Sequence, residues 1–353
     1  MRLKKSICFV FIIICIFTLP ACADAVGIQD VNSNNDTTVN GELSAWLPYW
    51  ETEKGIRELS KASDKLTSVS VFAVYFKNDG SLYVPAEMSD KYGEILNITD
   101  KNNINCYVSF VNDVIDENND IIQKDTDIVR KFLTNSAERT RHMDSLISYA
   151  VDNGFFGIEI DYEKIDESVW SEFVSFCGEL YNKCIEKKLA LRVVLEPRAP
   201  IDRYNLPEGP EYIMMSYNLY GLSTEPGPKA DVDFIKQLSE KINNIPEKKW
   251  FAFSTGGFDW QNGAETKSIT ESDALDIINV YKCLPARDEK SGCLYFYYTD
   301  ESGNEHTVWY ADNVTLDLWI NTAKECGYGD ICIWKLGGNV LETIEQMKSN
   351  FVK

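Results

Sequence analysis

The sequence predicts a (β/α)8 barrel, in which eight parallel strands alternate with helices around a closed core. Three observations lead to this fold class. Eight short apolar stretches alternate with longer stretches of helical periodicity over about 300 residues. Several of the short stretches are apolar almost throughout, as parallel strands covered on both faces are. No glycine-rich phosphate loop follows the first stretch, which argues against the main alternative, an open doubly wound sheet.

Each predicted strand is a short apolar run. In chain order the runs are 45–50, 67–76, 105–110, 155–161, 189–195, 212–217, 250–254 and 330–336. Between them, apolar residues recur at three- and four-residue steps, which places them on one face of a helix. Such helical patterns cover residues 143–151, 169–177, 235–242 and 340–347.

Residues 293–310 depart from the alternation of strands and helices. Two aromatic-rich runs, 294–298 and 307–310, flank the turn-forming residues 300–304, and this arrangement predicts a β-hairpin. We interpret it as a small insertion after the seventh strand. A helix over residues 315–326 then leads into the eighth strand.

The first 42 residues lie outside the predicted barrel, which occupies residues 43–353. A positively charged start and an apolar run resemble a signal peptide, and Leu-Pro-Ala-Cys at 19–22 resembles a bacterial lipobox. We therefore expect residues 1–21 to be a lipoprotein signal peptide and Cys22 to carry lipid that anchors the exported protein to the outer face of a bacterial cell membrane. An ordinary signal peptide cut near Ala21 is the alternative. The polar composition of residues 22–42 predicts a flexible tether.

Composition limits the partners of this chain. It has 353 residues and a formal net charge of −20 without an offsetting basic stripe, so we expect no nucleic-acid partner. No His or Cys cluster has metal-ligand spacing, so no metal or other cofactor is expected. Among the cysteines after Cys22, only Cys283 and Cys293, which flank a Gly-containing loop, suggest a disulfide. We expect a monomer.

The fourth predicted strand carries a row of acids. From residue 158 onward it alternates strictly between apolar or aromatic residues and the acids Glu159, Asp161 and Glu163. Residues two apart share one face of a strand, so the three carboxyl groups lie about 6–7 Å apart. Like charges at this spacing favour a retained proton near neutral pH, as acid-catalysed glycoside cleavage requires. A solvated surface strand would show the same pattern, but a barrel strand has no wet face, so the acids should point into the barrel.

This strand resembles the signature of glycoside hydrolase family 18, the chitinases and endo-N-acetylglucosaminidases. The family motif D-G-x-D-x-D-x-E stands here as Phe-Gly-Ile-Glu-Ile-Asp-Tyr-Glu at 156–163. Asp161 and Glu163 match the family's assisting aspartate and general acid. Phe156 and Glu159 replace its first two aspartates.

Other segments resemble the family in order and spacing, and the resemblance spans residues 44–350. Residues 214–221 resemble the sixth-strand M-x-Y-D segment, with Asn218 where Asp is usual. Residues 331–338 resemble the eighth-strand segment that supplies a Trp beneath the sugar. Residues 46–50 look like the first strand, and residues 308–312 like a segment of the spore-cortex-hydrolase branch. The third-strand S-x-G-G motif is absent.

The resemblance implies a retaining, endo-acting glycosidase that hydrolyses β-1,4 bonds after N-acetylglucosamine in chitin, peptidoglycan or N-glycan cores. Its catalysis would be substrate-assisted, an exception to the two-carboxylate scheme. Glu163 would protonate the glycosidic oxygen, while Asp161 and Tyr217 would hold the substrate's acetamido group. Glu159 would tune Asp161 through a shared proton.

Aromatic and polar residues near the strand ends are the expected sugar contacts. The substrate-binding candidates are Trp334, Asn218, Met215, Tyr49 and Trp50. A catalytically silent sugar-binding protein on the same barrel is the alternative from another functional class, since a fold does not guarantee chemistry. A two-carboxylate glycosidase with acids on strands four and seven is disfavoured, because the seventh strand offers no Glu.

Overall fold

The computed structural model describes residues 40–118, 120–246, 248–262 and 266–351. The expected signal peptide, Cys22 and nearly all of the expected tether lie outside these residues. No helix within the described ranges has the length and apolar character needed to cross a membrane.

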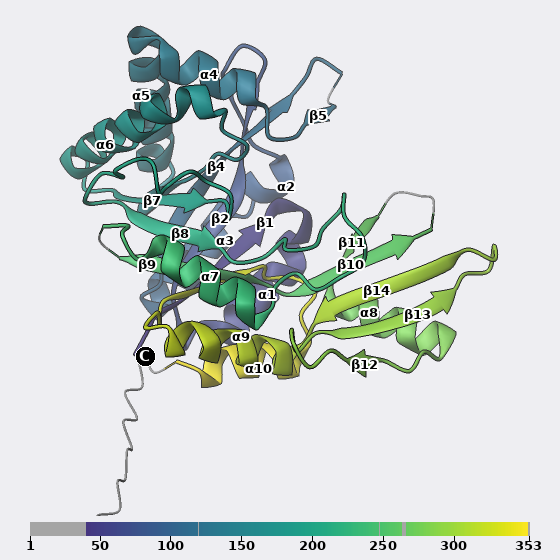
Figure 1. Ribbon diagram of the computed structural model, residues 1–353. Coiled ribbons are helices and arrows are strands. Elements are labelled where there is room, and N and C mark those ends of the chain that lie inside the picture. The colour runs from purple at the N-terminus through teal and green to yellow at the C-terminus, as the bar shows by residue number, and fades with distance from the viewer. Residues whose placement is uncertain (1–39, 119, 247, 263–265, 352–353) are drawn as a thin grey trace, which may run out of the picture. The chain divides into compact units, whose positions relative to one another are not determined.

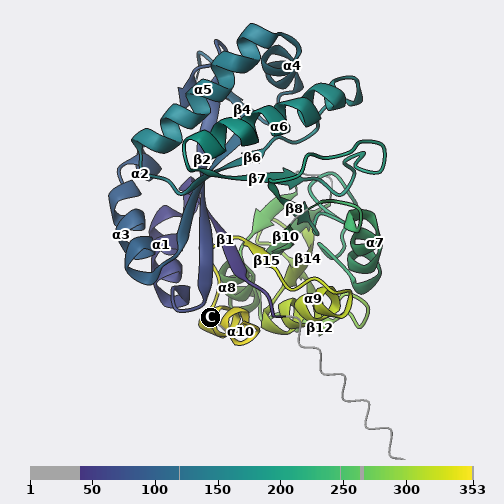
Figure 2. The ribbon, with the colours of Figure 1, turned by 90° about the vertical axis from the view of Figure 1, so that its left-hand side faces the viewer.

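Eight parallel strands form a closed barrel, which confirms the predicted fold class, and Figure 2 shows helices surrounding them. The strands run in the order β2-β1-β15-β9-β8-β7-β6-β4, and pairing of β2 with β4 closes the ring. Each corresponds to one of the eight predicted runs. Their bounds are β1 Leu43–Pro48, β2 Leu66–Lys77, β4 Asn105–Ile115, β6 Gly157–Asp161, β7 Ala190–Leu195, β8 Glu211–Met215, β9 Lys249–Ser254 and β15 Ile331–Trp334.

Most helices lie between successive barrel strands and cover the outside of the barrel, whereas α8 packs on a second, five-stranded sheet. Several begin at an Asp, Asn or Thr whose side chain accepts a hydrogen bond from the first turn, which satisfies amide groups that have no partner within the helix. Their bounds are α1 Thr52–Ala62, α2 Ala86–Ser89, α3 Tyr92–Asn102, α4 Thr126–Thr134, α5 Ser136–Asp152, α6 Trp170–Glu186, α7 Val232–Ile242, α8 Glu271–Tyr281, α9 Asn313–Glu325 and α10 Leu341–Ser349, with short 3-10 turns η1 Tyr49–Glu51 and η2 Glu167–Val169.

Strand β6 presents its two faces as the alternation predicts. Ile158 and Ile160 are fully buried in the apolar layer between strands and helices. Glu159 and Asp161 are also buried, but Glu159 contacts side chains of β1, β2 and β4 across the barrel interior. The acids therefore face the lumen, because a strand in a closed barrel has one face toward the helices and one toward the interior.

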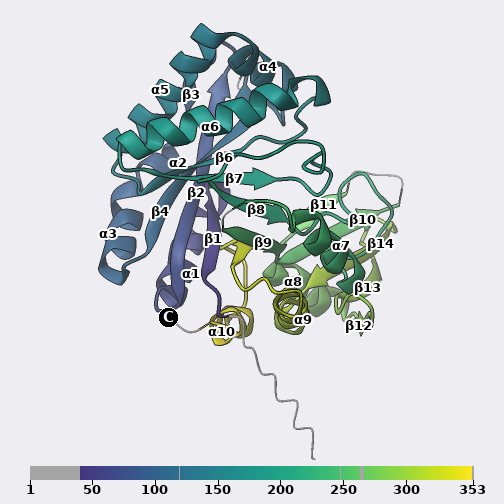
Figure 3. The same cartoon turned by 60° about the vertical axis from the view of Figure 1, so that its left-hand side comes forward.

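The predicted hairpin is present, but it belongs to a larger insertion. Strands β13 (Leu294–Thr299) and β14 (Glu305–Ala311) pair antiparallel within a five-stranded sheet of order β11-β10-β14-β13-β12. The other members are β10 Gly256–Gln261, β11 Lys267–Ile269 and β12 Ala286–Arg287. Figure 3 shows this sheet on the side toward which β7 and β8 run.

Glycine allows β10 to leave the barrel and join the insertion. Only Thr255 separates β9 from β10, and Gly256 has a φ of 63°. A Cβ at Gly257 would lie 1.7 Å from the carbonyl oxygen of Trp309, so no side chain fits where β10 pairs with β14. The sequence analysis missed β10 because a continuous run of apolar residues and glycine gave no sign of this change of direction.

The suggested disulfide between Cys283 and Cys293 is wrong. Every cysteine in the described part of the chain is free. Cys293 is buried in the layer that covers the barrel, whereas Cys283 packs against a separate apolar cluster of the insertion. Flanking a short loop therefore did not bring the two sulfurs together.

Two short strands extend the barrel wall at its mouth. Strand β3 (Leu82–Tyr83) pairs antiparallel with the end of β2, and β5 (Ile121–Ile122) pairs antiparallel with the end of β4. Figure 1 shows β5 projecting beyond the end of β4. Both isoleucines of β5 are about half exposed, and the chain that follows them returns to the mouth of the barrel.

Candidate active site

A cavity of about 380 Å³ lies at the C-terminal ends of the barrel strands. This is the end at which barrels of this architecture hold their active sites. The cavity is lined by residues of the barrel strands and the loops that follow them, and by Phe258 and Ser268 of the insertion. Most of the predicted site residues line it: Glu163, Asp161, Tyr217, Trp334, Asn218, Met215, Tyr49 and Trp50.

Glu159 lies beneath the cavity rather than in its wall. One of its carboxyl oxygens accepts hydrogen bonds from Trp46 Nε1 and Ser109 Oγ, both at 2.5 Å, and the other accepts from Ser70 Oγ at 2.7 Å. These three donors satisfy the carboxylate inside the barrel. The negative charge of Glu159 raises the pKa of Asp161, while the hydrogen bonds that Glu159 accepts come from the three donors.

Asp161 is almost completely buried at the floor of the cavity. Burial raises the pKa of this carboxyl well above its usual range, and the negative charges of Glu163 and Glu159 raise it further. Its Oδ1 atom is buried without a hydrogen-bond partner in the described structure. A buried acceptor without a donor is costly, so a donor supplied by a ligand would be bound favourably here.

Glu163 stands where β6 ends, and its backbone is fixed by the neighbouring strand. The Asn112 side chain accepts from the Glu163 amide and donates to the Glu163 carbonyl, both at 2.9 Å. The Glu163 carboxylate forms an ion pair with Lys124. Burial raises the pKa of Glu163, Lys124 opposes this, and the nearby Glu196 and Asp113 add to the increase, so the pKa is raised overall.

Trp334 presents an aromatic surface on the opposite side of the cavity. Its ring contacts Phe72 at a centroid distance of 4.8 Å, Trp46 at 5.8 Å and Trp50 at 6.0 Å. Trp50 is about half exposed, whereas Trp334 is only partly exposed. Rings fixed in this way offer the flat apolar surface on which the apolar face of a pyranose can pack.

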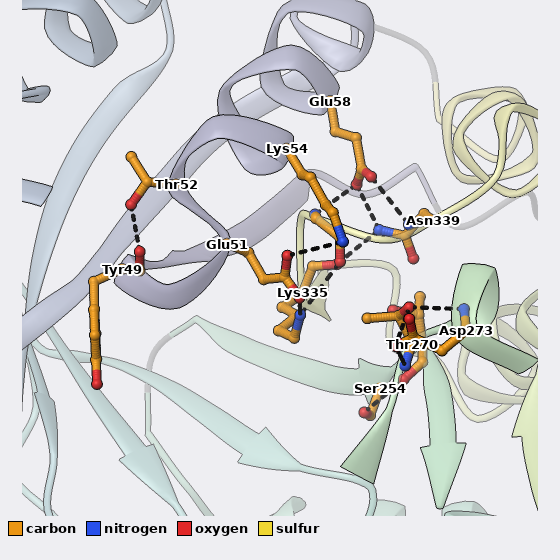
Figure 4. Close-up of polar contacts among 12 residues, drawn as sticks. Tyr49, Glu51, Thr52, Lys54, Glu58, Ser254, Thr270, Asp273, Lys335 and Asn339 are labelled. Atoms are coloured by element: carbon orange, nitrogen blue, oxygen red, sulfur yellow. Dashed lines mark hydrogen bonds and ion pairs between the residues drawn. The ribbon is translucent and has the colours of Figure 1, made fainter. Parts of the chain in front are cut away.

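The chain after Trp334 is tied to the first helix, as Figure 4 shows. Lys335 Nζ lies 3.0 Å from Glu51 Oε1. The buried carboxylate of Glu58 accepts from the Gly337 amide at 2.7 Å and from the Asn339 side chain at 2.6 Å. These contacts fix the segment that follows the aromatic wall.

Tyr217 and Asn218 follow β8 at the rim. Tyr217 is buried, and burial together with the charges of Asp161 and Glu163 raises the pKa of its hydroxyl, which therefore stays protonated as a hydrogen-bond donor. Asn218 is exposed and has a φ of 64°, a conformation that Asn tolerates better than most residues. Met215, the last residue of β8, is buried.

Two lysines in the cavity wall were missed by the sequence analysis. Lys124 follows β5, and Lys229 precedes α7. The Lys229 ammonium donates to Ser254 Oγ at 2.8 Å and to the Thr255 carbonyl at 3.1 Å, and burial lowers its pKa to about 7. Both lysines lie in loops without periodicity, so no local pattern marks them. In the described residues no group of His, Cys, Asp and Glu is arranged to hold a metal ion.

Comparison with known families decides the classification. The family described as "Glycosyl hydrolases family 18" matches residues 45–339. The chain belongs to this family. The glycosyl hydrolase match extends from within β1 to beyond β15 and includes both Asp161 and Glu163.

Curated relatives in the family are distant in sequence. The chain is 27% identical over 225 residues to an uncharacterized glycosylase, YvbX, of Bacillus subtilis, covering 59% of this chain and 64% of that protein. It is 23% identical over 290 residues to a cortical fragment-lytic enzyme of Bacillus anthracis, covering 77% of this chain and 65% of that protein. The chain thus spans slightly less than two thirds of these relatives.

Solved structures show the same fold at low sequence identity. The spore cortex-lytic enzyme SleL of Bacillus cereus superposes with a TM-score of 0.74 at 19% identity, over 89% of this chain and 75% of that one. A chitinase from Chromobacterium violaceum gives a TM-score of 0.74 at 20% identity, over 88% and 98% respectively.

Proposed function

We propose that this family 18 glycosidase is a retaining, endo-acting enzyme that hydrolyses β-1,4 bonds after N-acetylglucosamine, with the substrate's own acetamido group as the nucleophile. The observation that carries the proposal is the pair formed by Asp161 and Glu163. Both carboxyls line one cavity with raised pKa values, and Asp161 has a buried oxygen without a donor. An acid that keeps its proton and an acceptor awaiting an N–H suit this mechanism.

The first step would be protonation of the glycosidic oxygen by Glu163. As the bond to the leaving sugar breaks, the acetamido carbonyl oxygen would attack the anomeric carbon and form a cyclic oxazolinium ion. Asp161 would accept the acetamido N–H at its unpaired Oδ1 and stabilise the positive charge on the ring. Tyr217 would donate a hydrogen bond to the acetamido oxygen and orient it for attack.

The second step would return the enzyme to its starting state. Glu163, now ionised, would remove a proton from a water molecule as that water attacks the anomeric carbon. The oxazolinium ring would open and restore the acetamido group. Two displacements at the same carbon give a product with retained configuration.

Sugar binding would rest on the aromatic side of the cavity. Trp334 would pack against the apolar face of the sugar whose bond is cleaved, supported from behind by Trp46 and Phe72. Trp50 and Tyr49, which line the cavity, would contact neighbouring sugars, and Met215 and Asn218 would contact the sugar above β8.

A catalytically silent sugar-binding protein is the second candidate. The ion pair between Lys124 and Glu163 favours it, because a neighbouring cation favours the ionised form of Glu163, which has no proton to donate. Phe156, which replaces the first Asp of the family motif, gives this alternative no further support, because its ring packs on Tyr107 outside the cavity wall. The names of the relatives, which include chitinases and cortex-lytic enzymes, support catalysis on chitin or spore-cortex glycans.

The experiment that tests the proposal compares the purified full chain with Glu163→Gln. The substrates are chito-oligosaccharides, peptidoglycan glycan strands and a high-mannose glycoprotein. We expect cleavage of at least one substrate, a decrease in kcat of about 10²–10⁴-fold in the variant, and a first-formed product in the β configuration by proton NMR. Glu179→Gln, which removes the same charge from the surface of α6, should retain full activity. If neither protein cleaves anything while both bind N-acetylglucosamine oligomers, the silent binding function replaces the enzyme.

We also propose that Cys22 carries the lipid anchor predicted from its lipobox-like context. Replacing Cys22 with Ser would then move the protein from the membrane fraction to the medium of an expressing bacterium. Recovery of Cys22→Ser in the membrane fraction at the wild-type level would contradict the anchor.

A further inference from the structure

We propose that Lys229 is a positioning residue for the aromatic side of the cavity. Its ammonium group holds the segment in which β9 ends, and this segment in turn holds the backbone of Trp334. The inference rests on the proposed function, in which a sugar packs against the Trp334 ring. It gives a lysine of the loop between β8 and α7 a part in substrate affinity, although this lysine belongs to none of the residues expected to contact the sugar.

The hydrogen bonds of Lys229 lead to the residues beside Trp334. Its ammonium group donates to Ser254 Oγ at 2.8 Å and to the Thr255 carbonyl at 3.1 Å. Ser254 is the partner of Trp334 in the parallel pairing of β9 with β15, and the Thr255 amide donates to the Trp334 carbonyl at 2.8 Å. Lys229 and Trp334 are therefore connected through the same two residues.

The segment that Lys229 holds is the point at which the chain leaves the barrel wall. Strand β9 ends at Ser254, and its pairing with β15 ends there too. The chain then turns at Gly256 into β10 of the insertion. A buried carbonyl at such a turn needs donors from elsewhere, and the Thr255 carbonyl receives them from the side chains of Lys229 and Ser254.

The backbone of Lys229 is itself fixed at the rim of the cavity. The Leu219 amide donates to the Lys229 carbonyl at 2.9 Å, and the Tyr220 amide donates to the Pro228 carbonyl at 3.3 Å. These bonds close the loop that follows Tyr217. Lys229 thus joins the end of β8 to the end of β9, so its ammonium group is held from a fixed support rather than from a free loop.

No acid offsets the charge of this lysine. In the described part of the chain Lys229 forms no ion pair, its Nζ lies 4.9 Å from the centre of the Phe258 ring, and the charge of Lys335 opposes its ammonium group. Burial of such a cation is costly, and an apolar side chain of similar length would avoid the cost. A gain in stability therefore does not explain the lysine, whereas the ordering of Thr255 beside Trp334 does.

An ordered platform favours binding of the sugar. A ring that is already fixed loses little conformational freedom when the sugar packs on it, so less of the interaction energy is spent on ordering. Packing against Trp334 stabilises bound substrate and transition state alike. Loss of the Lys229 contacts should therefore weaken binding and raise KM while kcat stays nearly unchanged.

The experiment is a double-mutant cycle for binding of the β-1,4-linked hexasaccharide of N-acetylglucosamine, measured by calorimetry at about pH 6, below the Lys229 pKa of about 7. Every protein is the purified full chain with Glu163→Gln, so that bound sugar is not cleaved. Lys229→Met removes the donors but keeps a long unbranched side chain, and we expect Kd to rise about 10-fold. When Trp334→Ala is also present, the same replacement should change Kd by less than about 2-fold.

Two further variants separate positioning from a merely structural role. Lys241→Met removes another partly buried lysine, which donates to the Pro197 carbonyl at 2.6 Å from α7, and should keep the Kd of the parent protein. Ser254→Ala removes one acceptor of Lys229 and should raise Kd about 2- to 3-fold, again only while Trp334 is present. A merely structural role would instead lower Tm and the number of binding sites per chain, and it would leave Kd unchanged.

The outcomes separate this inference from the proposed function. An equal rise in Kd with and without Trp334, or no rise in either Lys229→Met or Ser254→Ala, would overturn the role of Lys229 and leave the glycosidase intact. If the cycle shows the expected coupling but the wild type cleaves no substrate, the inference holds for a silent sugar-binding protein and the enzymatic function fails. Absence of hexasaccharide binding would overturn both the inference and the proposed specificity for N-acetylglucosamine.

Discussion

Replacing Glu159 tests which of two effects of this buried carboxylate has the larger influence on the free energy of unfolding. One effect is the hydrogen bonds that it accepts, and the other is the cost of removing its charge from water. Glu159 is completely buried and accepts from Trp46, Ser70 and Ser109. In Glu159→Ala these three donors lose their acceptor, and each unsatisfied buried donor costs about 1–3 kcal/mol. The serine hydroxyls can rotate toward other acceptors, but the indole N–H of Trp46 cannot. We therefore expect a loss of about 3–5 kcal/mol in the free energy of unfolding.

Glu159→Gln is the matched comparison. Its carbonyl oxygen can still accept from Trp46 and Ser109, while its amide group donates to Ser70, whose hydroxyl reorients. We expect a loss of about 1 kcal/mol, because the shape and most hydrogen bonds remain. The opposing effect is desolvation, since removing a buried charge relieves the cost of taking it out of water.

Urea unfolding followed by tryptophan fluorescence measures the difference between the two variants. A lower midpoint for Glu159→Ala than for Glu159→Gln, at equal dependence on urea, would support the hydrogen-bond account. Equal midpoints, or an alanine variant more stable than the glutamine variant, would refute it and show that relief of the buried charge dominates.

Three further predictions concern the cavity. In Tyr217→Phe we expect kcat to fall about 10- to 100-fold with little change in KM, because the lost hydroxyl acts on the acetamido oxygen during attack; an unchanged kcat would contradict that role. Because the pKa of Asp161 is raised in the folded state, its contribution to stability is fully present at pH values below the usual pKa of a carboxyl group. This contribution is lost as the pH rises through the pKa that Asp161 has in the folded protein. Asp161→Asn should therefore gain in Tm relative to the wild type at alkaline pH but not at acid pH, and an equal difference at both would argue against a raised pKa. The pKa of Lys229, lowered to about 7, predicts that the wild type gains stability between pH 7 and the ordinary lysine value of 10.5; Lys229→Met should lack this gain in urea titrations, and the same gain in the variant would exclude Lys229 as its source.

The barrel and its row of acids were predictable because both depend on local periodicity. Alternation along β6 placed Glu159 and Asp161 on one face, and closure of the barrel turned that face inward. The eight strands were recognised from apolar runs that are short enough to be strands and separated by helical periods. The order of motifs along the chain then brought Tyr217 and Trp334 to the same cavity.

The residues that were missed are placed by contacts distant in sequence. Lys124 reaches Glu163 because β5 folds back on β4, and because the Asn112 side chain donates to the carbonyls of both Asp125 and Glu163. No pattern in the sequence indicates these contacts. Strand β10 was missed for a similar reason, since its partner β14 follows about 50 residues later and pairing of this kind has no local signature. The disulfide prediction failed because proximity in sequence did not indicate which apolar cluster each cysteine would join.

The contact between the first and last strands of the barrel has a consequence for how the chain folds. Strand β1 pairs with β15, and the Glu42 amide donates to Asp330, 288 positions later. Glu58 likewise accepts hydrogen bonds from residues that follow β15. A contact of such long range forms slowly, because the intervening loop must be closed first. Until β15 has been synthesised, β1 has an unpaired edge, and a nascent or truncated chain would expose that edge to pairing with another copy.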